Sequence, residues 1–495
     1  MDVAINERIS LSNLDRIYYD GRWNEPSSDG RLRLVNPATE EALPSPVESR
    51  LTDVERAIAA ARNAFDAGPW PRMTPQKRAD YLRAMYEALV RRSEELAHAW
   101  TLQIGTPFAM ARSATDAAIE LFAYYATQST SFPWVEQHES SYPGHVGIVA
   151  REAVGVVAAI VPWNGPLQIA AVKIAPALLA GCTVILKPAP ETPLEAYILA
   201  EAAEEAGLPA GVFNVVAADR AASELLVTSP AVDKVSFTGS SAAGRRIGAL
   251  AGGRIARVTL ELGGKSAAVV LDDFPLDEAA EILSQTAIRL SGQVCSNLTR
   301  VLVPETLHDR LCDAMVARFE KVKVGDPYDP STDMGPLAMK RQLDRVEDYI
   351  RIGRKEGAAL LTGGGRPSGI YRGYFIEPTL MGRVDNRTTI AREEIFGPVI
   401  CAIPYKNVDH AVSLANDSQF GLGGAVFTRD ADAAYRIARG IRTGTIGQNG
   451  SRTDLGIGYG GFKQSGVGRE GGIQGIHNYV ESKTIVLTGL PAAVK

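Results

Sequence analysis

The sequence predicts an α/β fold with two successive, mainly parallel sheets. From Val154 onward, short β-branched runs alternate with alanine-rich stretches of helical periodicity, and a second such series follows Gly264. The expected strands are apolar along most of their length and do not alternate with polar residues. This pattern is typical of parallel strands that are covered by helices on both faces of the sheet.

Each series supplies its own set of elements. In the first, strands are expected at 154–162, 183–187, 212–216 and 234–237, with helices at 166–180, 193–206 and 241–251. In the second, strands are expected at 266–271, 299–303, 399–404 and 425–428, with helices at 277–290, 305–320, 342–356 and 431–441. The two series therefore predict two α/β domains, and the second begins near residue 265.

Four further segments lie outside these series. Apolar residues at three- and four-residue spacing predict amphipathic helices at 54–65 and 77–100. Two β-prone segments, 139–152 and 479–488, have no place in either sheet. We expect them to pair with each other or with another subunit.

Composition narrows the class of protein. The chain has 495 residues, of which 45% are hydrophobic, and a net charge of −5. These values are typical of a globular protein with more than one domain. No Lys/Arg-rich run is present, and the longest apolar run, 154–161, is far shorter than the ~20 residues of a membrane-spanning helix. Neither a nucleic acid nor a membrane is therefore expected as a partner.

Cysteines, histidines and the N-terminal segment give further expectations. The four cysteines form no CxxC pair, which favours free thiols in a reducing compartment. The six histidines have no metal-ligand spacing, so no metal site is expected. The polar segment Met1–Ser10 does not have the pattern of a signal peptide. We therefore expect a cytoplasmic protein.

Cys295 is the first candidate for chemistry. It lies in Ser-Gly-Gln-Val-Cys-Ser-Asn between an expected helix and an expected strand, and Gly292 permits a tight turn and close approach of a ligand. A free cysteine taken alone is more often a small core residue than a nucleophile. For Cys182 and Cys312, which lie in apolar patterns, the core interpretation is favoured.

Two polar side chains complete a candidate catalytic set. Glu261 ends an apolar run directly before a glycine pair, where a carboxylate needs either an ionic partner or a cavity. Partial burial would raise its pKa and suit it to act as a general base, whereas a structural ion pair is the alternative. Asn164 stands where a strand stops and a helix begins, so it is either a helix N-cap or a donor to an oxyanion.

Two further motifs are suited to a dinucleotide. Lys187 ends the expected strand Thr-Val-Ile-Leu-Lys, at the edge where open α/β sheets bind cofactors. In Phe-Thr-Gly-Ser-Ser-Ala-Ala-Gly, Gly239 and Ser240 open a helix whose free N–H groups favour a phosphate. The motif is not GxGxxG, and each of these signals is weak when taken alone.

Together, the order and spacing of these motifs resemble the aldehyde dehydrogenase superfamily. The resemblance is carried by Pro-Trp-Asn164, Lys187-Pro, Phe-Thr-Gly-Ser240, Glu261-Leu-Gly-Gly-Lys, Gly-Gln-Val-Cys295, Glu394-Ile-Phe-Gly-Pro-Val and Tyr459-Gly-Gly-Phe-Lys-Gln-Ser-Gly-Val-Gly-Arg-Glu. It implies a Rossmann-type dinucleotide-binding domain (1–136 and 154–264), a second α/β catalytic domain (265–470) and a β oligomerisation arm (137–153 and 471–495).

The resemblance also implies roles for individual residues. Cys295 would be the nucleophile that forms a thiohemiacetal and then a thioester, Glu261 the base for hydrolysis, and Asn164 part of the oxyanion hole with the Cys295 N–H. The residues implied in binding NAD, or NADP, are Trp163, Lys187, Gly239, Ser240, Gly244, Glu394 and Phe396. The residues expected to touch the aldehyde are Val294, Ser296, Leu455 and Tyr459. A homodimer or homotetramer is the assembly that the resemblance suggests.

Two departures from the family pattern bear on specificity. NAD-preferring relatives often carry Glu three residues after the ribose-binding lysine, whereas this chain has Pro190, so use of NADP stays open. Gly165 and Val172 stand where relatives often carry bulky side chains, which favours a wide substrate tunnel. The sequence does not identify the aldehyde.

Three other functions remain as alternatives. A cysteine hydrolase would need a histidine near Cys295, and none lies in the neighbouring motifs. An aldehyde dehydrogenase that transfers the acyl group to coenzyme A would not need Glu261 to activate water. A catalytically silent binding protein on the same fold would tolerate loss of Cys295 or Glu261, and both are present.

Overall fold

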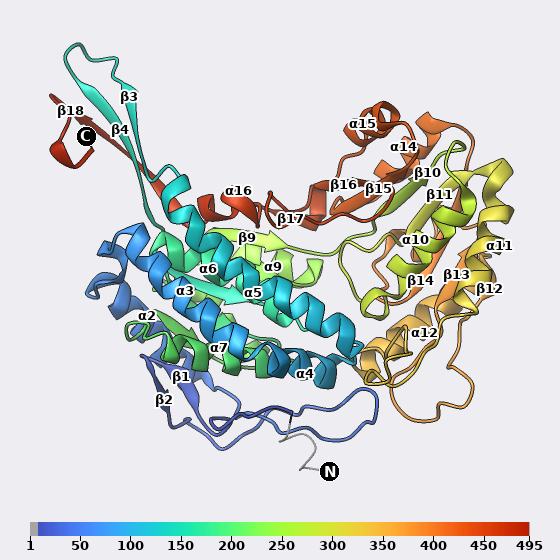
Figure 1. Cartoon of the computed structure of the whole chain (residues 1–495), viewed down its shortest axis with the longest axis horizontal. Coiled ribbons are helices and arrows are strands. Elements are labelled where there is room, and N and C mark those ends of the chain that lie inside the picture. The colour runs from blue at the N-terminus through green and yellow to red at the C-terminus, as the bar shows by residue number, and fades with distance from the viewer. Residues whose placement is uncertain (1–7, 495) are drawn as a thin grey trace.

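Two large sheets, one from each predicted series, form the body of the molecule, and a thin three-stranded sheet projects from one end (Figure 1). The structure is a computed structural model that describes residues 8–494. Most of the N-terminal segment Met1–Ser10, and the last residue of the predicted arm, therefore lie outside the described residues. No helix among the described residues is long and apolar enough to cross a membrane.

The first sheet has six strands in the order β17-β9-β8-β5-β6-β7. Their bounds are β5 (Val156–Ile160), β6 (Thr183–Lys187), β7 (Phe213–Val215), β8 (Lys234–Thr238), β9 (Arg257–Glu261) and β17 (Gly466–Val467). All neighbours are parallel except β17, which pairs antiparallel with the end of β9. Five parallel strands thus end at one edge of the sheet, where Lys187 and Glu261 are the last residues of β6 and β9.

Helices cover both faces of this sheet because its strands are apolar on both sides. One face packs on α3 (Pro75–Arg91), α5 (Phe108–Ser131), α6 (Pro166–Ala180) and α7 (Leu194–Glu205). The other packs on α2 (Leu51–Asp66), α8 (Arg220–Thr228) and α9 (Ser241–Gly253). Along β5, Val157 and Ala159 join the first core while Val156 and Ala158 join the second, as the two-residue repeat of a strand requires.

The second sheet has seven strands in the order β12-β13-β14-β11-β10-β15-β16. Their bounds are β10 (Ala267–Val270), β11 (Arg300–Pro304), β12 (Ala359–Thr362), β13 (Thr379–Gly382), β14 (Val399–Tyr405), β15 (Gly423–Phe427) and β16 (Thr445–Gln448). Only β12 is antiparallel to its neighbour. The covering helices are α10 (Leu276–Ile288), α11 (His308–Phe319), α12 (Lys340–Lys355), α13 (Thr389–Arg392), α14 (Val408–Asn416) and α15 (Ala431–Gly440).

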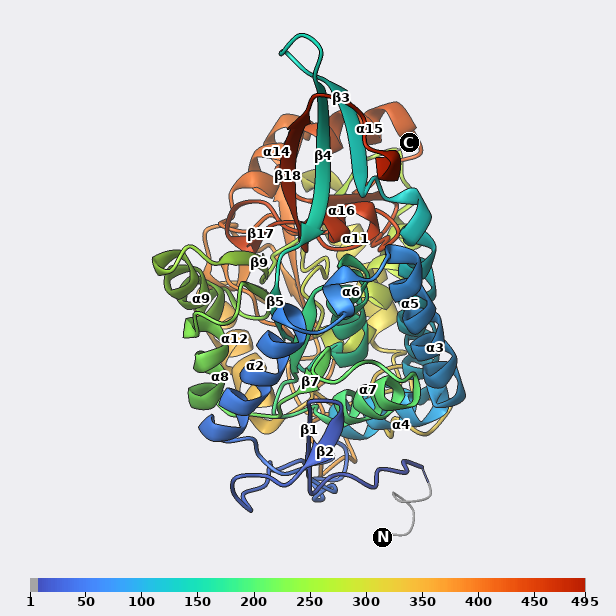
Figure 2. The same ribbon diagram turned by 90° about the vertical axis from the view of Figure 1, so that its left-hand side faces the viewer.

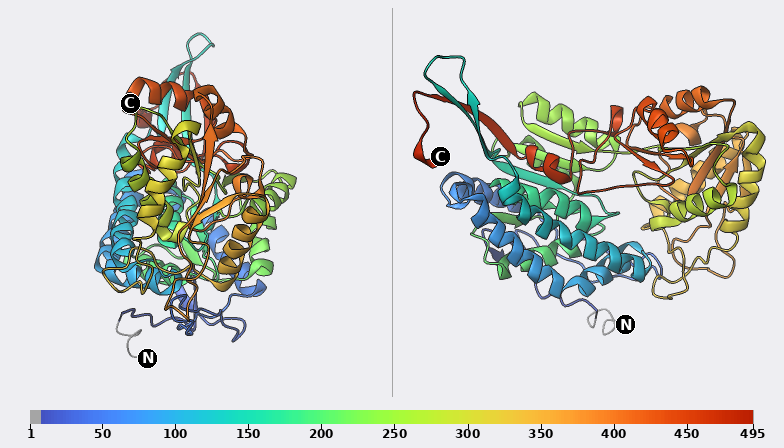
Figure 3. Two further views of the ribbon diagram at one scale, coloured as in Figure 1. Left: turned by 90° about the vertical axis from the view of Figure 1, so that its right-hand side faces the viewer. Right: turned by 45° about the horizontal axis from the view of Figure 1, so that its top comes forward.

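The two β-prone segments outside the series pair with each other. Strand β4 (Val146–Ala153) lies between β3 (Val135–Glu139) and β18 (Val480–Leu487), and both pairings are antiparallel. This sheet extends beyond the body of the molecule in Figures 2 and 3. The remaining elements are a hairpin, a short helix and single turns of 3₁₀ helix: β1 (Ile17–Tyr19), β2 (Arg22–Asn24), α16 (Gly472–His477), η1 (Trp70–Arg72), η2 (Arg289–Gly292), η3 (Glu305–Leu307), η4 (Lys463–Ser465) and η5 (Ala492–Val494).

The expected helix at 77–100 is wrong as a single element. The structure has two helices there, α3 and α4 (Ser93–Ile104), separated at Arg92, where φ is −113° and ψ is 14°. The Arg92 guanidinium holds the break by donating to Glu95 and Glu201. Helical spacing of apolar residues continues across the break, so periodicity alone does not locate it.

Candidate active site

Two cavities between the large sheets meet at Cys295. One, here called the tunnel, has a volume of about 690 Å³ and is lined by α5, α6, the loop around Cys295 and the segment 451–459. The other, here called the cleft, has a volume of about 290 Å³ and lies at the carboxyl edge of the six-stranded sheet. Asn164 and Cys295 line both cavities. A ligand in the tunnel and a ligand in the cleft would therefore meet at these two side chains.

The loop that carries Cys295 has an unusual backbone. Leu290, Ser291 and Gly292 are three successive residues with φ of 49°, 53° and 75°. A left-handed conformation costs roughly 1–2 kcal/mol for a residue with a side chain, so the surrounding contacts must hold it in place. The Ser291 hydroxyl lies 2.8 Å from the carbonyl oxygen of Gly335 and 3.0 Å from that of Pro336.

Gln293 fixes the next part of this loop. Its Nε2 donates to the Leu290 carbonyl at 2.9 Å, and its Oε1 accepts from the Ala338 N–H at 3.0 Å. Cys295 then lies in a turn between η2 and β11, as the sequence predicts. Cys182 and Cys312 are buried in the core, also as predicted.

Replacing Gly292 by Ala is expected to lower both turnover and stability. A Cβ atom there would lie 2.2 Å from the Gly397 carbonyl, and neither backbone can move away freely. Relief requires the loop to shift, and a displacement of about 1 Å typically costs about 100-fold in rate. Steady-state kcat and the thermal midpoint measure the effect.

A matched control for that variant is Gly252→Ala. Gly252 is exposed in α9, and a Cβ atom there would meet nothing within 4 Å. We expect wild-type kcat and an unchanged or slightly higher midpoint. Wild-type kcat in Gly292→Ala would contradict the close approach of the loop to Gly397.

The Cys295 thiol lies in a low-polarity environment. Its pKa is raised to about 11, mainly by burial, and the neighbouring carboxyl groups of Glu394 and Glu261 contribute to this rise. The Tyr459 hydroxyl oxygen lies 3.6 Å from Sγ, and this contact acts in the opposite direction, lowering the pKa of the thiol. Tyr459 is thus the side chain in contact with Cys295 that favours the thiolate, which is the nucleophilic form.

Replacing Tyr459 by Phe is expected to raise the pKa of Cys295 further. A hydroxyl that donates to a thiolate stabilises the charged form, so its loss should slow alkylation of Cys295 about threefold to tenfold at a fixed alkaline pH. The measurement is the pH profile of alkylation by iodoacetamide, with the modified cysteine located by peptide mass. Tyr124→Phe is the control, because the Tyr124 hydroxyl lies 3.3 Å from the Gly456 carbonyl and away from the thiol. Superimposable profiles for Tyr459→Phe and wild type would contradict the expectation.

Glu261 is a buried carboxyl group at the carboxyl end of β9. It is 3% exposed, and neither of its oxygens has a hydrogen-bond partner among the described residues. Burial, followed by the nearby Glu470 carboxylate, raises its pKa well above the usual value, although Lys173 and Arg469 act against this. One oxygen lies against the backbone of Gly460, the residue after Tyr459. A carboxyl group whose pKa is raised in this way is a stronger proton acceptor than an exposed glutamate, which suits it to act as a general base.

A buried ion pair lies beside Glu261 and was not expected from the sequence. Lys173 of α6 and Glu470 are almost fully buried, with 2.5 Å between Nζ and Oε1. The Ser236 hydroxyl lies 3.2 Å from the same Glu470 oxygen. Glu470 is the last residue of the motif that begins at Tyr459, and its place in this motif is the sequence signal that could have identified it. Lys173 had none, because it lies within an apolar helix.

Asn164 is held directly above the loop of Cys295. Its side-chain Nδ2 donates to the backbone carbonyl of Gln293 at 3.0 Å. The backbone carbonyl of Asn164 accepts from the Trp100 indole N–H at 3.2 Å. The N-cap residue of α6 is Gly165, which excludes the N-cap interpretation of Asn164. A side-chain amide has two N–H bonds, so one remains for an oxyanion after the contact with Gln293 is made.

The cleft gathers most of the residues expected at a dinucleotide. Trp163, Gly239, Ser240, Glu394 and Phe396 line it, and the Trp163 and Phe396 rings meet edge to face with centroids 5.3 Å apart. Ser240 is the N-cap of α9, as predicted, and its hydroxyl accepts from the Ala243 N–H at 3.3 Å. Glu394 accepts from the Gly264 N–H at 3.0 Å, and burial raises its pKa to about 7.

Lys187 and Gly244 are not among the residues that line the cleft. Lys187 pairs with Ile160 of β5 near the cleft, and burial lowers the pKa of its amine to about 8. Gly244 lies in the first turn of α9, where a Cβ atom would be 2.4 Å from the Leu262 side chain. Its position therefore serves close packing of the helix on the strand that borders the cleft.

The residues of the cleft fit a dinucleotide cofactor. A helix N-terminus favours a phosphate, a carboxylate with one free oxygen suits a sugar hydroxyl, and an aromatic pair offers a flat apolar wall. Gln342 and Arg345 of α12 are among the lining residues that the sequence analysis did not predict. Gln342 donates to the Phe396 carbonyl at 2.7 Å and so holds a residue whose φ is 64°.

The tunnel gathers the other expected residues. Val294, Ser296, Leu455 and Tyr459 line it together with Glu261, Asn164 and Cys295. Gly165 and Val172, the two small residues in the sequence, line it as well. No histidine is among its lining residues in the described part of the chain, and a cysteine hydrolase would need one.

Comparison with known proteins agrees with this geometry. The sequence matches the aldehyde dehydrogenase family over residues 23–485. It is 44% identical over 475 residues to geranial dehydrogenase of Castellaniella defragrans, covering 96% of this chain and 98% of that one.

Two solved structures are similar over nearly the whole chain. An aldehyde dehydrogenase of Mycobacterium tuberculosis, complexed with NAD+, has a TM-score of 0.94 at 42% identity, covering 97% of this chain and 99% of its own. A betaine aldehyde dehydrogenase of Staphylococcus aureus, also in complex with NAD+, has a TM-score of 0.95 at 34% identity, covering 99% and 98%. The predicted fold class and enzyme class are confirmed. This chain belongs to the aldehyde dehydrogenase family.

Proposed function

We propose that this protein oxidises an aldehyde to a carboxylic acid with NAD+ as hydride acceptor and without coenzyme A. The observation that carries the proposal is the meeting of the tunnel and the cleft at Cys295 and Asn164. An aldehyde held in the tunnel and a nicotinamide held in the cleft would share one reaction centre there. The buried carboxyl group of Glu261 lines the tunnel beside that centre.

In the first half-reaction, the Cys295 thiol gives its proton to solvent and the sulfur attacks the aldehyde carbon to form a thiohemiacetal. The free N–H of Asn164 and the Cys295 backbone N–H donate to the developing oxyanion, a contribution of about 10²–10³ in rate per donor. Bound NAD+ accepts the hydride that leaves the carbon when the C–O bond becomes a carbonyl. Cys295 then carries a thioester.

In the second half-reaction, Glu261 takes a proton from a water molecule, which attacks the thioester carbonyl. The carbon–sulfur bond breaks, the thiolate is released and the carboxylic acid leaves. Over the cycle, aldehyde, NAD+ and water give carboxylate, NADH and two protons. Glu261 distinguishes this course from transfer to coenzyme A, because only hydrolysis needs a base for water.

The choice of NAD+ is supported by the relatives and by the cleft. Both structural relatives described above are complexes with NAD+. Because residue 190 is proline, it offers no carboxylate that would repel the 2′-phosphate of NADP+. NADP+ is therefore tested beside NAD+. We propose that Glu394 and Lys187 bind ribose hydroxyls and that Trp163, Gly239, Ser240, Gly244 and Phe396 shape the rest of the cofactor site.

Replacing Glu394 by Gln is expected to raise the KM for NAD+ about tenfold, because a charged acceptor is lost. The pKa of Glu394 in the wild type, about 7, predicts how the KM for NAD+ depends on pH. The carboxylate form grows between about pH 6 and about pH 8, so the wild-type KM should fall over this interval. The variant should lack that fall. Glu393→Gln is the control, because exposed Glu393 pairs with Tyr349 outside the cleft; an equal rise there would contradict the assignment.

The tunnel favours a substrate with an apolar body. Its wall is mainly apolar, with Trp100, Met110, Leu121, Val172 and Leu455 among the lining side chains. Val294, Ser296, Leu455 and Tyr459 are the residues we propose to touch the substrate. The relative from Castellaniella defragrans is named for geranial, which is consistent with an apolar aldehyde.

We further propose a role for each sheet. The six-stranded sheet with its helices (1–136 and 154–264) would bind the cofactor, and the seven-stranded sheet (265–470) would carry the nucleophile. The three-stranded sheet (137–153 and 471–495) would join subunits in a homodimer or homotetramer. Its outer strands β3 and β18 each have one edge that pairs with no other strand in the described part of the chain, which suits pairing with another chain.

One assay tests the proposed function. The purified protein is mixed with straight-chain aldehydes and either NAD+ or NADP+, with and without coenzyme A, and the reduced cofactor is followed by absorbance. We expect NADH and the free carboxylic acid without coenzyme A. No aldehyde-dependent reduction, or an absolute need for coenzyme A, would overturn the proposal.

A further inference from the structure

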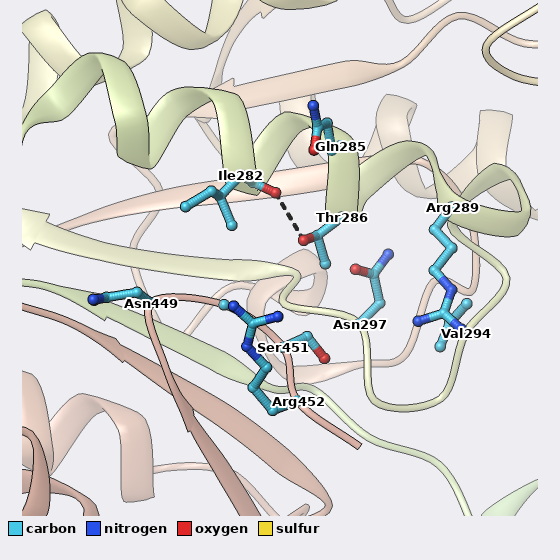
Figure 4. Close-up of a pocket in the computed structure, with 10 residues that line it drawn as sticks. Ile282, Gln285, Thr286, Arg289, Val294, Asn297, Asn449, Ser451 and Arg452 are labelled. Atoms are coloured by element: carbon cyan, nitrogen blue, oxygen red, sulfur yellow. Dashed lines mark hydrogen bonds between the residues drawn. The ribbon is translucent and has the colours of Figure 1, made fainter. Parts of the chain in front are cut away.

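A third cavity lies beside the tunnel and shares part of its wall. This cavity, here called the side chamber, has a volume of about 340 Å³ and is formed by the end of α10, the loop of Cys295 and the segment 449–452. It shares Arg289, Val294, Ser451 and Arg452 with the tunnel wall. Figure 4 shows the side chains of Arg289, Arg452 and Asn297 in this chamber. A ligand longer than a short aldehyde would reach these groups without leaving the cavity system.

Two positive charges, Arg289 and Arg452, line both the tunnel and the side chamber, and both side chains are exposed. Neither Arg289 nor Arg452 forms a salt bridge or a side-chain hydrogen bond with another described residue. No aspartate or glutamate is among the residues that line the chamber. Guanidinium groups without a partner are suited to bind a carboxylate through paired N–H donors.

Asn297 gives an independent indication of a ligand. It is 4% exposed, it lines the side chamber, and both its Oδ1 and its Nδ2 lack a hydrogen-bond partner among the described residues. Burying an unpaired amide is costly, and native structures rarely leave one unsatisfied. Its NH2 group can donate to an anion that the arginines hold. Three groups from three separate segments therefore offer donors to one cavity.

The rest of the tunnel disfavours an anion near the nucleophile. Glu261 and Glu470 line its inner part, and Asp454 lines its exposed segment. The rest of the tunnel wall is mainly apolar. A negative group on the substrate is thus attracted to the arginines of the side chamber and disfavoured along the apolar wall, which would orient the substrate with its opposite end toward Cys295.

We propose that the side chamber binds a carboxylate at the far end of the substrate, so that the preferred aldehydes are ω-oxocarboxylates. The aldehyde group would lie at Cys295, the methylene chain along the apolar wall, and the carboxylate at Arg289, Arg452 and Asn297. This inference rests on the proposed function and specifies the substrate class of the same site. The product would be a dicarboxylate, so the reaction that consumes it acts on diacids.

The test compares matched substrates on the full-length enzyme with NAD+. Straight-chain ω-oxocarboxylates are paired with unsubstituted aldehydes of the same chain length, from butanal to decanal. At the best length, kcat/KM for the ω-oxocarboxylate is expected to exceed that for its partner by about tenfold or more, because hydrogen bonds to a charged group are lost in the partner. Raised salt should reduce this preference.

Two variants assign the preference to the arginines. In Arg289→Gln and Arg452→Gln, kcat/KM for the ω-oxocarboxylate is expected to fall about tenfold, with the unsubstituted aldehyde within about twofold of wild type. Arg452→Lys should retain part of the preference that Arg452→Gln loses, because lysine keeps the positive charge but lacks the planar guanidinium group. Arg436→Gln is the control and should change neither value, because exposed Arg436 of α15 lines none of the three cavities.

The outcomes separate this inference from the proposed function. If neither class of aldehyde reduces NAD+, the proposed function fails. If unsubstituted aldehydes are oxidised but no ω-oxocarboxylate is preferred at any length, the carboxylate site is wrong. It is also wrong if the preference exists but survives in both Gln variants. Retained turnover of the unsubstituted aldehyde shows that the variants are folded.

Discussion

Replacing Cys295 by Ala is expected to reduce aldehyde-dependent NADH formation by about 10⁴-fold or more. The side chain supplies the atom that bonds to the substrate, and loss of a nucleophile typically has an effect of this size. The neighbouring groups cannot substitute for it, because Ser296 and Tyr459 are hydroxyls that lack an activating base of the histidine type among the tunnel residues. Initial rates with saturating aldehyde and NAD+ measure the loss.

Two controls make this result specific. Cys312→Ala removes a buried thiol of α11 that lines neither cavity, and it should keep near wild-type turnover. Binding of NAD+ to Cys295→Ala, followed by quenching of tryptophan fluorescence, should be unchanged, because Trp163 lines an intact cleft. Substantial turnover by Cys295→Ala would contradict covalent catalysis at this residue.

Replacing Glu261 by Gln is expected to separate the two half-reactions. Hydride transfer precedes the step that needs a base, so the first turnover should still release NADH as a burst. Steady-state turnover should fall about 10²–10⁴-fold, the usual contribution of a general base. Stopped-flow absorbance measures both phases. An equal loss of burst and steady rate would mean that Glu261 acts on the thiol rather than on water.

The same substitution should stabilise the protein at neutral pH. The pKa of Glu261 is raised in the folded state, so the folded protein favours the protonated carboxyl and ionisation above the unfolded pKa opposes folding. Gln removes this cost, and the thermal midpoint should rise by about 2 °C or more at about pH 8. The gain should shrink as the pH falls and vanish below about pH 3, where the wild-type group is protonated in both states. A lower midpoint at about pH 8 would contradict the unpaired burial of Glu261.

Much of the framework was predictable because it depends on local patterns. Strand β6 has the predicted bounds 183–187, and α6 has the predicted bounds 166–180. Both are mainly apolar runs bounded by glycine or proline, because α6 begins at Pro166 and is followed by Gly181, and β6 is followed by Pro188. Glu261 and Lys187 were expected at strand ends, and both lie at the carboxyl edge of the six-stranded sheet.

The break between α3 and α4 and the backbone of the Cys295 loop were not predictable in the same way. Arg92 ends a helix although the apolar spacing continues, because its guanidinium is bound by Glu201 from a distant helix. Leu290 and Ser291 adopt positive φ although neither is glycine. Contacts with Gly335 and Pro336 hold Ser291 there, and such contacts exist only after the chain has folded.

Residues that act across segments were also missed. Lys173 and Glu470 meet beside Glu261 although they are far apart in the chain. Arg289, Asn297 and Arg452 come together around one chamber, and each taken alone is an ordinary surface or loop residue in the sequence. The motifs located the reacting groups, whereas the shape and charge of the surrounding cavity required the tertiary structure.

Intact mass of the Glu261→Gln variant tests the central claim most directly. The variant is mixed with hexanal and NAD+, stopped with acid after one turnover, and weighed. The account predicts a protein heavier by the mass of hexanal less two hydrogen atoms, with the acyl group on the peptide that contains Cys295. It also predicts no such adduct without NAD+ or in the double variant with Cys295→Ala. An unmodified protein after an NADH burst, or an acyl group on another residue, would contradict the account.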